Sequence, residues 1–365
     1  MTTATQTVRH GATLRGKEVD FRVWAPTPQQ ITLRLTRAGQ PPQDIPMRRD
    51  GEDFVATAEA RVGDRYAYIL DASQPIPDPV SRFLPEGVHG PTEIVDPCMY
   101  AWCDEGWRGL PLEDYVIYEL HIGTFTPEGT FAAAAERLPY LKHLGITVVE
   151  VMPVAATPGA RNWGYDGVSP YAVQNNYGGP AAFRRFIDAA HELGLAVMLD
   201  VVYNHLGPEG NYLPMFGPYF TAHHKTPWGD AINYDDESCE QVRRYVVNNA
   251  LYWIREYHLD GLRLDAVQTI KDGSPKHILA EIQENVQALA AELNRTVVVI
   301  AETDENDSRY VEPPPNGYGL NAVWSDDFHH ALHALLTGER TGYYKDFGKP
   351  EQIAKALRDG YVFQG

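Results

Sequence analysis

The sequence predicts an α/β domain built on a parallel sheet, preceded by a small β-sandwich. Three observations predict this architecture. Residues 1–95 carry short segments in which apolar and polar residues alternate, separated by glycine and proline. After Leu112, short apolar runs alternate with longer helical patterns, which is typical of βα units. Several of these apolar runs end in charged residues, as strands do where a barrel carries its catalytic groups.

The predicted sandwich rests on four segments with the two-residue period of a strand. They are residues 21–24, 31–35, 54–56 and 66–70. The proline-rich stretch that follows, residues 71–107, contains few helix formers and is interpreted as a connector on the surface of the next domain. The predicted boundaries are residues 1–95 for the sandwich, 96–111 for a linker and 112–365 for the βα domain.

Six apolar runs in the βα domain are strand candidates. They are residues 116–120, 147–152, 196–201, 261–264, 297–301 and 322–324. Helical patterns lie between or after them, over residues 131–144, 181–193, 240–257, 277–293 and 352–358. Strands covered on both faces are expected to be continuously apolar, and residues 297–300 are. A doubly wound sheet and a barrel share this alternation, so the pattern leaves the closure of the sheet open.

Composition excludes two classes of partner. The formal net charge is −18, from 31 Lys and Arg against 49 Asp and Glu residues. Nucleic acids and anionic membranes attract the opposite charge, so neither is an expected partner. Residues 1–20 lack the apolar core of a secretory signal, and no apolar run is long enough for a transmembrane helix. Cys98, Cys103 and Cys239 lack metal-site spacing, and we expect a reduced, cytoplasmic protein.

Asp265 and Glu302 follow two successive strand candidates and form the pair that glycoside hydrolysis needs. A retaining mechanism uses an ionised nucleophile and a protonated acid about 5–5.5 Å apart. Neighbouring strands are about 4.8 Å apart, so carboxylates at equal heights on two such strands meet this requirement. Arg263 lies two residues before Asp265 and therefore on the same face, where its charge favours the ionised carboxylate. Glu302 is expected to stay protonated through burial and proximity to Asp265.

Polar residues also follow two other strand candidates. Asp200, Asn204 and His205 follow one, and Tyr165 lies beside the end of another. Each has a structural alternative: Asp265 could be a helix N-cap, Asp200 and Asn204 could form turns, and His205 could be a buried, hydrogen-bonded histidine. Loop aromatics such as Tyr165 suit the C–H faces of sugars, although most aromatics serve packing alone. The order of these residues on successive strands favours a catalytic site.

These motifs closely resemble those of the α-amylase superfamily of glycoside hydrolases. The first family signature is matched by residues 200–205, the second by residues 261–266 and the third by Ala301 and Glu302. The resemblance implies a (β/α)8 TIM barrel of α-amylase type, with about six βα units present, behind an N-terminal β-sandwich. It also implies that Asp265 is the nucleophile and Glu302 the general acid/base.

The resemblance extends to substrate-binding residues. It implies that Arg263 positions the nucleophile, that Asp200 and His205 bind the sugar at subsite −1, and that Tyr165 stacks on that sugar. Asp327 lies in a segment that is also similar to family members, and we expect it to contact substrate.

The N-terminal residues narrow the resemblance within the superfamily. Residues 21–26 resemble the sandwich module of branching, debranching and trehalose-forming members. Four segments are similar to the trehalohydrolases that act on malto-oligosyltrehalose: residues 78–82, 85–91, 118–126 and 324–330. This similarity implies hydrolysis of the α-1,4 bond next to the terminal trehalose unit, with release of trehalose. Two alternatives stay open, a branching or debranching enzyme and a non-catalytic glucan-binding protein.

The fourth family signature, an Asn-His-Asp after the seventh strand, has no counterpart before Gly365. Its aspartate is the third catalytic carboxylate of the family. An open parallel sheet exposes hydrogen-bonding edges, so we expect a fragment of a longer polypeptide or a chain completed by another. Such a chain can hold Asp265 and Glu302 and still be inactive. Asn204 matches a calcium ligand of some α-amylases, but the six to eight oxygens that calcium needs cannot be assembled, and neither a metal nor a cofactor is expected.

Overall fold

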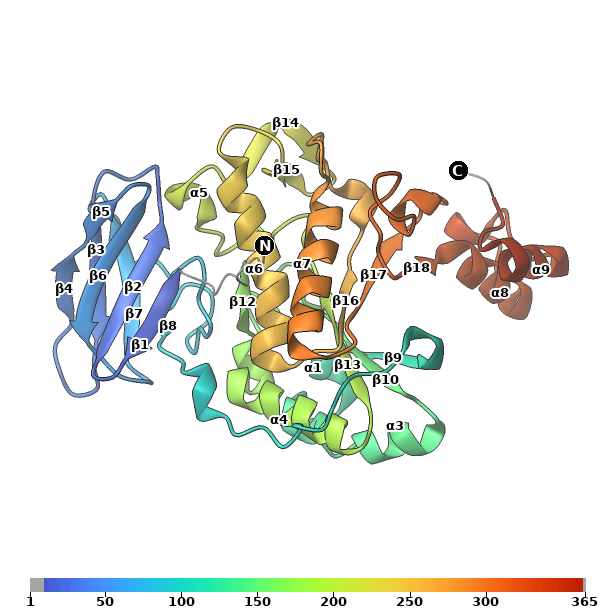
Figure 1. The fold of residues 1–365 in the computed structure, drawn as a ribbon, viewed down its shortest axis with the longest axis horizontal. Coiled ribbons are helices and arrows are strands. Elements are labelled where there is room, and N and C mark those ends of the chain that lie inside the picture. Colours follow the sequence, from blue (N-terminus) through green and yellow to red (C-terminus); the bar gives the residue numbers. More distant parts are fainter. Residues whose placement is uncertain (1–9, 364–365) are drawn as a thin grey trace.

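The computed structural model describes residues 10–363, which form a β-sandwich followed by a parallel sheet with helices packed against it (Figure 1). The expectation that residues 1–20 contain no secretory signal falls partly on residues 1–9, which lie outside the described residues. Within residues 10–363, no helix combines the length and the apolar character that crossing a bilayer requires.

Two four-stranded antiparallel sheets form the predicted sandwich. The order of one sheet is β1 (Gly11–Arg15), β2 (Glu18–Trp24), β6 (Asp53–Glu59) and β5 (Arg48–Asp50). The order of the other is β4 (Gln43–Pro46), β3 (Ile31–Thr36), β7 (Arg65–Leu70) and β8 (Thr92–Glu93). Alternate residues of β2 are buried, and the ring of Phe21 lies edge-on to Tyr66 with centroids 4.9 Å apart. This burial of every second side chain fixes the register of the strand.

Six parallel strands form the sheet of the second domain, as predicted from their apolar runs. From edge to edge they are β18 (Ala322–Ser325), β17 (Val298–Thr303), β16 (Gly261–Leu264), β13 (Ala196–Val201), β10 (Val148–Val151) and β9 (Ile117–Leu120). All residues of β10 and β13 are buried. Helices cover one face of these strands, and a second cluster of apolar side chains covers the other face. The described residues thus form an open parallel sheet of six strands, the number of βα units that the sequence predicts.

Most of the long helices lie where helical periodicity predicts them. They are α4 (Gly179–Glu192), α6 (Cys239–Tyr257), α7 (Ile278–Leu293) and α9 (Pro350–Asp359). The single helix expected over residues 131–144 is wrong, because it consists of α2 (Phe131–Ala135) and α3 (Leu138–Leu144). Pro139 lies in the first turn of α3, and its ring lacks the N–H that a continuous helix would use. No helix is predicted where α8 (Asp326–Thr337) lies.

Shorter elements complete this domain. They are α1 (Ile122–Phe125), β11 (Ala155–Ala156), β12 (Ser169–Val173), α5 (Leu213–Phe216), β14 (Phe220–Thr226) and β15 (Gly229–Ile232). Strands β14 and β15 form an antiparallel hairpin, and Trp228 lies in its turn. Helix α5 contacts the sandwich, where the ring centroids of Tyr68 and Phe216 are 6.2 Å apart.

Asp78 ties the sandwich to the connector that follows it. The residue is 1% exposed, and its Oδ2 accepts hydrogen bonds from the hydroxyls of Tyr66 (2.8 Å) and Tyr68 (3.0 Å). Four residues later, Arg82 forms an ion pair with Glu256 of α6, with Nη2 and Oε1 3.0 Å apart. The segment of residues 78–82 therefore has a structural role, in which it fixes the connector against both domains.

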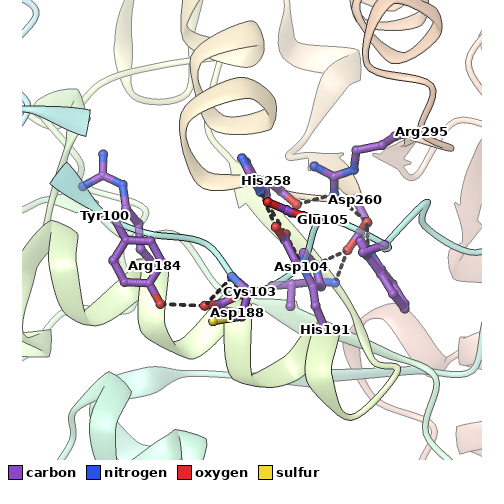
Figure 2. Close-up of polar contacts among 12 residues, drawn as sticks. Tyr100, Cys103, Asp104, Glu105, Arg184, Asp188, His191, His258, Asp260 and Arg295 are labelled. Atoms are coloured by element: carbon purple, nitrogen blue, oxygen red, sulfur yellow. Dashed lines mark hydrogen bonds and ion pairs between the residues drawn. The ribbon is translucent and has the colours of Figure 1, made fainter. Parts of the chain in front are cut away.

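A buried charged cluster anchors the linker to the amino-terminal end of the sheet (Figure 2). His191 of α4 lies between two carboxylates: its Nδ1 is 2.8 Å from Oδ2 of Asp104, and its Nε2 is 2.9 Å from Oδ2 of Asp260. Both partners accept hydrogen bonds, so both ring nitrogens donate and His191 is an imidazolium ion. At the two ends of the cluster, Asp104 binds His258 and Asp260 binds Arg295, at 2.8 and 2.9 Å.

This cluster predicts a decrease in stability at alkaline pH. Burial alone would lower the pKa of His191, but its hydrogen bonds to Asp104 and Asp260 raise it overall. A raised histidine pKa contributes stability below the unfolded value of about 6.5, and that contribution is lost as pH rises through the folded value. We expect the free energy of unfolding to fall from pH 6.5 to 9, and to fall less steeply in His191→Gln. Urea unfolding across this range measures both slopes, and equal slopes contradict the assignment.

Candidate active site

The carboxyl ends of β16 and β17 bring two acidic side chains together. The strands pair Leu264 with Ala301, so Asp265 and Glu302 occupy the next position on each strand. Side chains two residues apart share a face, and Arg263 therefore lies on the same face as Asp265. On the other side of β16, strand pairing places Asp200 of β13 directly opposite Arg263. The sequence motifs of three strands thus converge on one face of the sheet.

Arg263 lies at the centre of this group and contacts three carboxylates. Its Nη1 is 2.8 Å from Oδ2 of Asp200 and 2.8 Å from Oδ1 of Asp265, and its Nη2 is 3.6 Å from Oε2 of Glu302. The side chain is 12% exposed. Burial alone would lower the pKa of Arg263, but the neighbouring acids raise it above its usual value, so the guanidinium stays charged. A single buried cation therefore orients all three acids.

Asp265 is held by hydrogen bonds to both of its carboxylate oxygens. Oδ1 accepts from Arg263, and Oδ2 accepts from Nδ2 of Asn204 at 2.8 Å. The same amide nitrogen donates to the backbone carbonyl of Asp265 at 2.6 Å. Hydrogen bonds from a cation and an amide fix the direction of this carboxylate. This partner of Asn204 could not be identified from the sequence, because it lies 61 residues further along the chain.

Glu302 has a different environment. Its Oε2 accepts a hydrogen bond from the backbone N–H of Ala266 at 2.7 Å, and its nearest charged partner is the more distant Nη2 of Arg263. Burial raises the pKa of Glu302, although Arg263 and the Ala266 amide oppose this. Ala266 has a φ of 41°, a left-handed conformation that is unusual for a residue with a side chain and turns its amide toward Glu302. The environments of the two acids therefore differ, and that of Glu302 raises its pKa.

Tyr165 and His205 complete one side of the site. The hydroxyl of Tyr165 donates to Oδ2 of Asp200 at 2.8 Å, so this tyrosine helps to fix the position of the Asp200 carboxylate. His205 is hydrogen-bonded through Nδ1 to the amide oxygen of Asn204, and burial lowers its pKa. The ring of Trp228 stacks on His205 with centroids 4.2 Å apart and an interplanar angle of 14°. Sequence reasoning did not select Trp228, because only the β14–β15 hairpin brings it here.

Asp327 does not join this group. Its Oδ2 accepts hydrogen bonds from Nδ2 of Asn306 (3.0 Å) and from the backbone N–H groups of Val362 (2.7 Å) and Phe363 (2.8 Å). The carboxylate thus fastens the last described residues to α8. The preceding residue, Asp326, is the one whose charge acts on Glu302.

The described residues include no group of three or more His, Cys, Asp or Glu side chains arranged to hold a metal ion. Asn204, the residue that matches a calcium ligand of some α-amylases, uses both ends of its amide for protein contacts. Its Nδ2 binds Asp265 and its Oδ1 binds His205.

Comparison with known proteins supports both domains. Residues 9–97 match carbohydrate-binding module 48, the isoamylase N-terminal domain, and residues 99–217 match the alpha amylase catalytic domain. Over 350 residues the chain is 51% identical to the malto-oligosyltrehalose trehalohydrolase of Saccharolobus solfataricus, covering 95% of this chain and 60% of that relative. It is 48% identical over 350 residues to the enzyme of the same name from Arthrobacter ramosus, covering 94% and 60%.

A crystal structure shows the same arrangement. It is that of a Salmonella typhimurium protein provisionally identified as an alpha amylase, with a TM-score of 0.90 and 43% identity. The match covers 98% of this chain and 61% of that protein. The chain therefore spans about 60% of the length of the curated relatives it matches.

Proposed function

We propose, from the premise that this chain belongs to the α-amylase family, that it carries the catalytic pair of a retaining glycoside hydrolase acting on malto-oligosyltrehalose. The bond cleaved is the α-1,4 bond next to the terminal trehalose unit, and trehalose is released. The single observation that carries this proposal is the contact of Arg263 with three acids, Asp200, Asp265 and Glu302. Of these, Asp265 and Glu302 lie at the ends of neighbouring strands. The similarity to trehalohydrolases supports the choice of substrate.

Asp265 is the proposed nucleophile. An oxygen of its carboxylate attacks the anomeric carbon while Glu302 gives its proton to the glycosidic oxygen, and the bond between that carbon and oxygen breaks. The products are trehalose and a glycosyl ester of Asp265. A water molecule then attacks the same carbon, Glu302 takes its proton, and the ester bond breaks to regenerate both acids. Two inversions give net retention at the anomeric carbon.

The surrounding residues orient the substrate in this proposal. Asp200 and His205 bind hydroxyls of the sugar at subsite −1, and Tyr165 stacks on it. The positive charge of Arg263 is balanced mainly by Asp200 and Asp265 before reaction. When the ester forms, the charge of Asp265 is lost, and Arg263 is left paired with Asp200 and the newly ionised Glu302. The guanidinium therefore stabilises charge on whichever acid carries it at each step.

The test is trehalose release from maltotriosyl-trehalose by this chain and by Asp265→Ala. We expect release by the unmodified chain and a loss of at least about 10³-fold in the variant, because the covalent step is removed. Two other outcomes identify the rival functions. A change in α-1,6 branching instead of trehalose release indicates a branching or debranching enzyme. Glucan binding with no turnover, even in a chain completed with the rest of the barrel, overturns the hydrolase proposal and favours a binding protein.

We further propose that the reaction takes place in the cytoplasm and serves trehalose formation. The state of the cysteines supports this location: Cys98, Cys103 and Cys239 are free thiols, and two of them are exposed. Exposed free thiols are typical of proteins kept in a reducing compartment.

A further inference from the structure

Glu150 is a buried carboxyl group that the mechanism above does not use. It lies within β10 and is only 1% exposed. Strand pairing places it opposite Met198 of β13 and opposite Glu119 of β9. Asp200 lies two residues after Met198, on the same face of β13. Glu150 therefore lies on the same face of the sheet as Asp200, about two residues closer to the amino ends of the strands.

Glu150 and Asp200 each have a buried oxygen without a hydrogen-bond partner among residues 10–363. These oxygens are Oε2 of Glu150 and Oδ1 of Asp200. The other oxygen of Asp200 already accepts from Tyr165 and Arg263. Two ionised carboxylates can only accept, so both buried oxygens would lack a donor. One proton on the pair supplies the missing donor, since a protonated carboxyl group can give a hydrogen bond.

The charges around the pair also favour one proton. Arg263 is the cation of this face in the described structure, and it already contacts Asp200, Asp265 and Glu302. Glu150 is thus a fourth acid for one guanidinium. Adding its negative charge below Asp200 would be opposed by like-charge repulsion in a buried site.

The side chains on the neighbouring elements do not balance this excess of negative charge. From β9, Glu119 contributes another acid, which acts to raise the pKa of Glu150. From the loop after β13, His205 is disfavoured as a cation because burial lowers its pKa. Burial, and next the charge of Asp200, raise the pKa of Glu150 to about 8, whereas Arg263 opposes the shift. Burial also raises the pKa of Asp200, to about 7. Of the two acids, Asp200 already accepts hydrogen bonds from Tyr165 and Arg263, so the proton is assigned to Glu150.

We propose that Glu150 is a positioning residue for the active site: as a neutral acid it shares its proton with Asp200, directly or through one buried water, so that Asp200 stays ionised and fixed beside Arg263. This role rests on the proposed function, because it concerns the acid that binds sugar at subsite −1. Glu150 itself touches neither the sugar nor the reacting atoms.

The first test measures the proton without any activity assay. Infrared spectroscopy distinguishes a carboxylic acid from a carboxylate, and subtraction of the Glu150→Gln spectrum isolates the band of Glu150. We expect an acid band at pH 7 that titrates near pH 8, the value set by burial and Asp200. In Asp200→Asn the midpoint is expected to fall by about one pH unit or more, because the like charge is removed. A carboxylate band at pH 7, or a midpoint that ignores Asp200→Asn, overturns the proposal.

The second test uses turnover of maltotriosyl-trehalose. Glu150→Leu removes the donor and is expected to lower kcat/KM by about 10–100-fold, the effect of one lost hydrogen bond to a charged group. Glu150→Gln keeps an N–H donor and is expected to recover most of that loss and to extend activity above pH 8. Met198→Leu is the matched control, because it changes the packing at the paired position of β13 without changing a donor.

The outcomes separate this inference from the function it rests on. Equal losses in Glu150→Gln and Glu150→Leu, with an unchanged pH profile, reduce Glu150 to a packing role and overturn the proposal. No trehalose release, even by a chain completed with the rest of the barrel, overturns the proposed function instead. In that case the infrared titration still decides whether Glu150 holds a proton for Asp200.

Discussion

Glu302→Gln is expected to lower kcat/KM for maltotriosyl-trehalose by about 10²–10⁴-fold, the usual contribution of a general acid. Glutamine keeps the hydrogen bond from the Ala266 amide within reach, but it has no acidic proton for the leaving oxygen. α-Maltosyl fluoride does not need that proton, because fluoride leaves as an anion. Ester formation from this substrate is therefore expected to survive in Glu302→Gln, as a burst of fluoride before slow hydrolysis. Fluoride and trehalose assays on the same preparation measure the difference.

Two comparisons make this result specific to Glu302. Asp265→Asn is expected to lose activity on both substrates, because neither reaction can proceed without the nucleophile. Glu305→Gln is the matched control: Glu305 lies three residues further along and hydrogen-bonds the hydroxyl of Tyr310 at 2.7 Å. It is expected to keep activity within about threefold. A Glu302→Gln variant that retains a tenth or more of its activity on maltotriosyl-trehalose would falsify the assignment of the acid.

The pH dependence of the site has the same origin. Burial raises the pKa of Glu302, which keeps the acid protonated over a wider range than a free glutamate. Asp265 is held in place by hydrogen bonds from Arg263 and Asn204. In the proposed mechanism the raised pKa suits Glu302 to the role of acid, and the fixed direction of Asp265 suits it to the role of nucleophile.

The sheet was predictable because its strands leave a strong local signal. Fully buried parallel strands are expected to be apolar, as β10 and β13 are apart from Glu150 and Asp200, so each appears as a nearly continuous apolar run. The register of β16 and β17 then follows from the fold, and it brings Asp265 and Glu302 to neighbouring positions as spacing alone suggested. Motif order along the chain indicated which strand ends carry the chemistry.

Contacts between distant segments could not be predicted in this way. The stacking of Trp228 on His205 depends on the shape of the β14–β15 hairpin, and the amide contact of Asn204 to Asp265 crosses two strands. The sequence does not indicate the role proposed for Glu150, because that role depends on the unpartnered oxygen of Asp200 on the next strand. Helix α8 was missed although its apolar residues keep helical spacing, at positions 328, 331, 332 and 335.

Buried acids and cations are matched at the amino end of the sheet but not at its carboxyl end. At the carboxyl end, the guanidinium of Arg263 contacts three acids, Asp200, Asp265 and Glu302. Acidic groups therefore outnumber cations there and can take part in proton transfer. At the amino end, His191 and Arg295 together match Asp104 and Asp260, and every carboxylate oxygen named there has a donor. We interpret the first arrangement as chemistry and the second as structural support for it.

Asp260→Asn is expected to destabilise the protein by about 3–5 kcal/mol, the usual cost of breaking a buried ion pair on one side. Asp260 is 0% exposed. Its Oδ2 binds His191 and the Val197 amide, both at 2.9 Å, and its Oδ1 binds Arg295 at 2.9 Å and Nε1 of Trp107 at 2.7 Å. Asparagine keeps the shape but removes the charge and turns an N–H toward groups that already donate. Two buried cations would then lack their shared anion.

Urea unfolding followed by tryptophan fluorescence measures this loss, and Trp107 reports on the cluster directly. Asp44→Asn is the control, because Asp44 also accepts two hydrogen bonds from an arginine, Arg34, at 2.8 and 2.7 Å, but on an exposed surface. Its expected cost is below about 1 kcal/mol. Adding His191→Gln to Asp260→Asn should cost less than the sum of the two single changes, because the second change removes a cation that the first has left unpaired. Additive losses would show that His191 and Asp260 do not act as a pair.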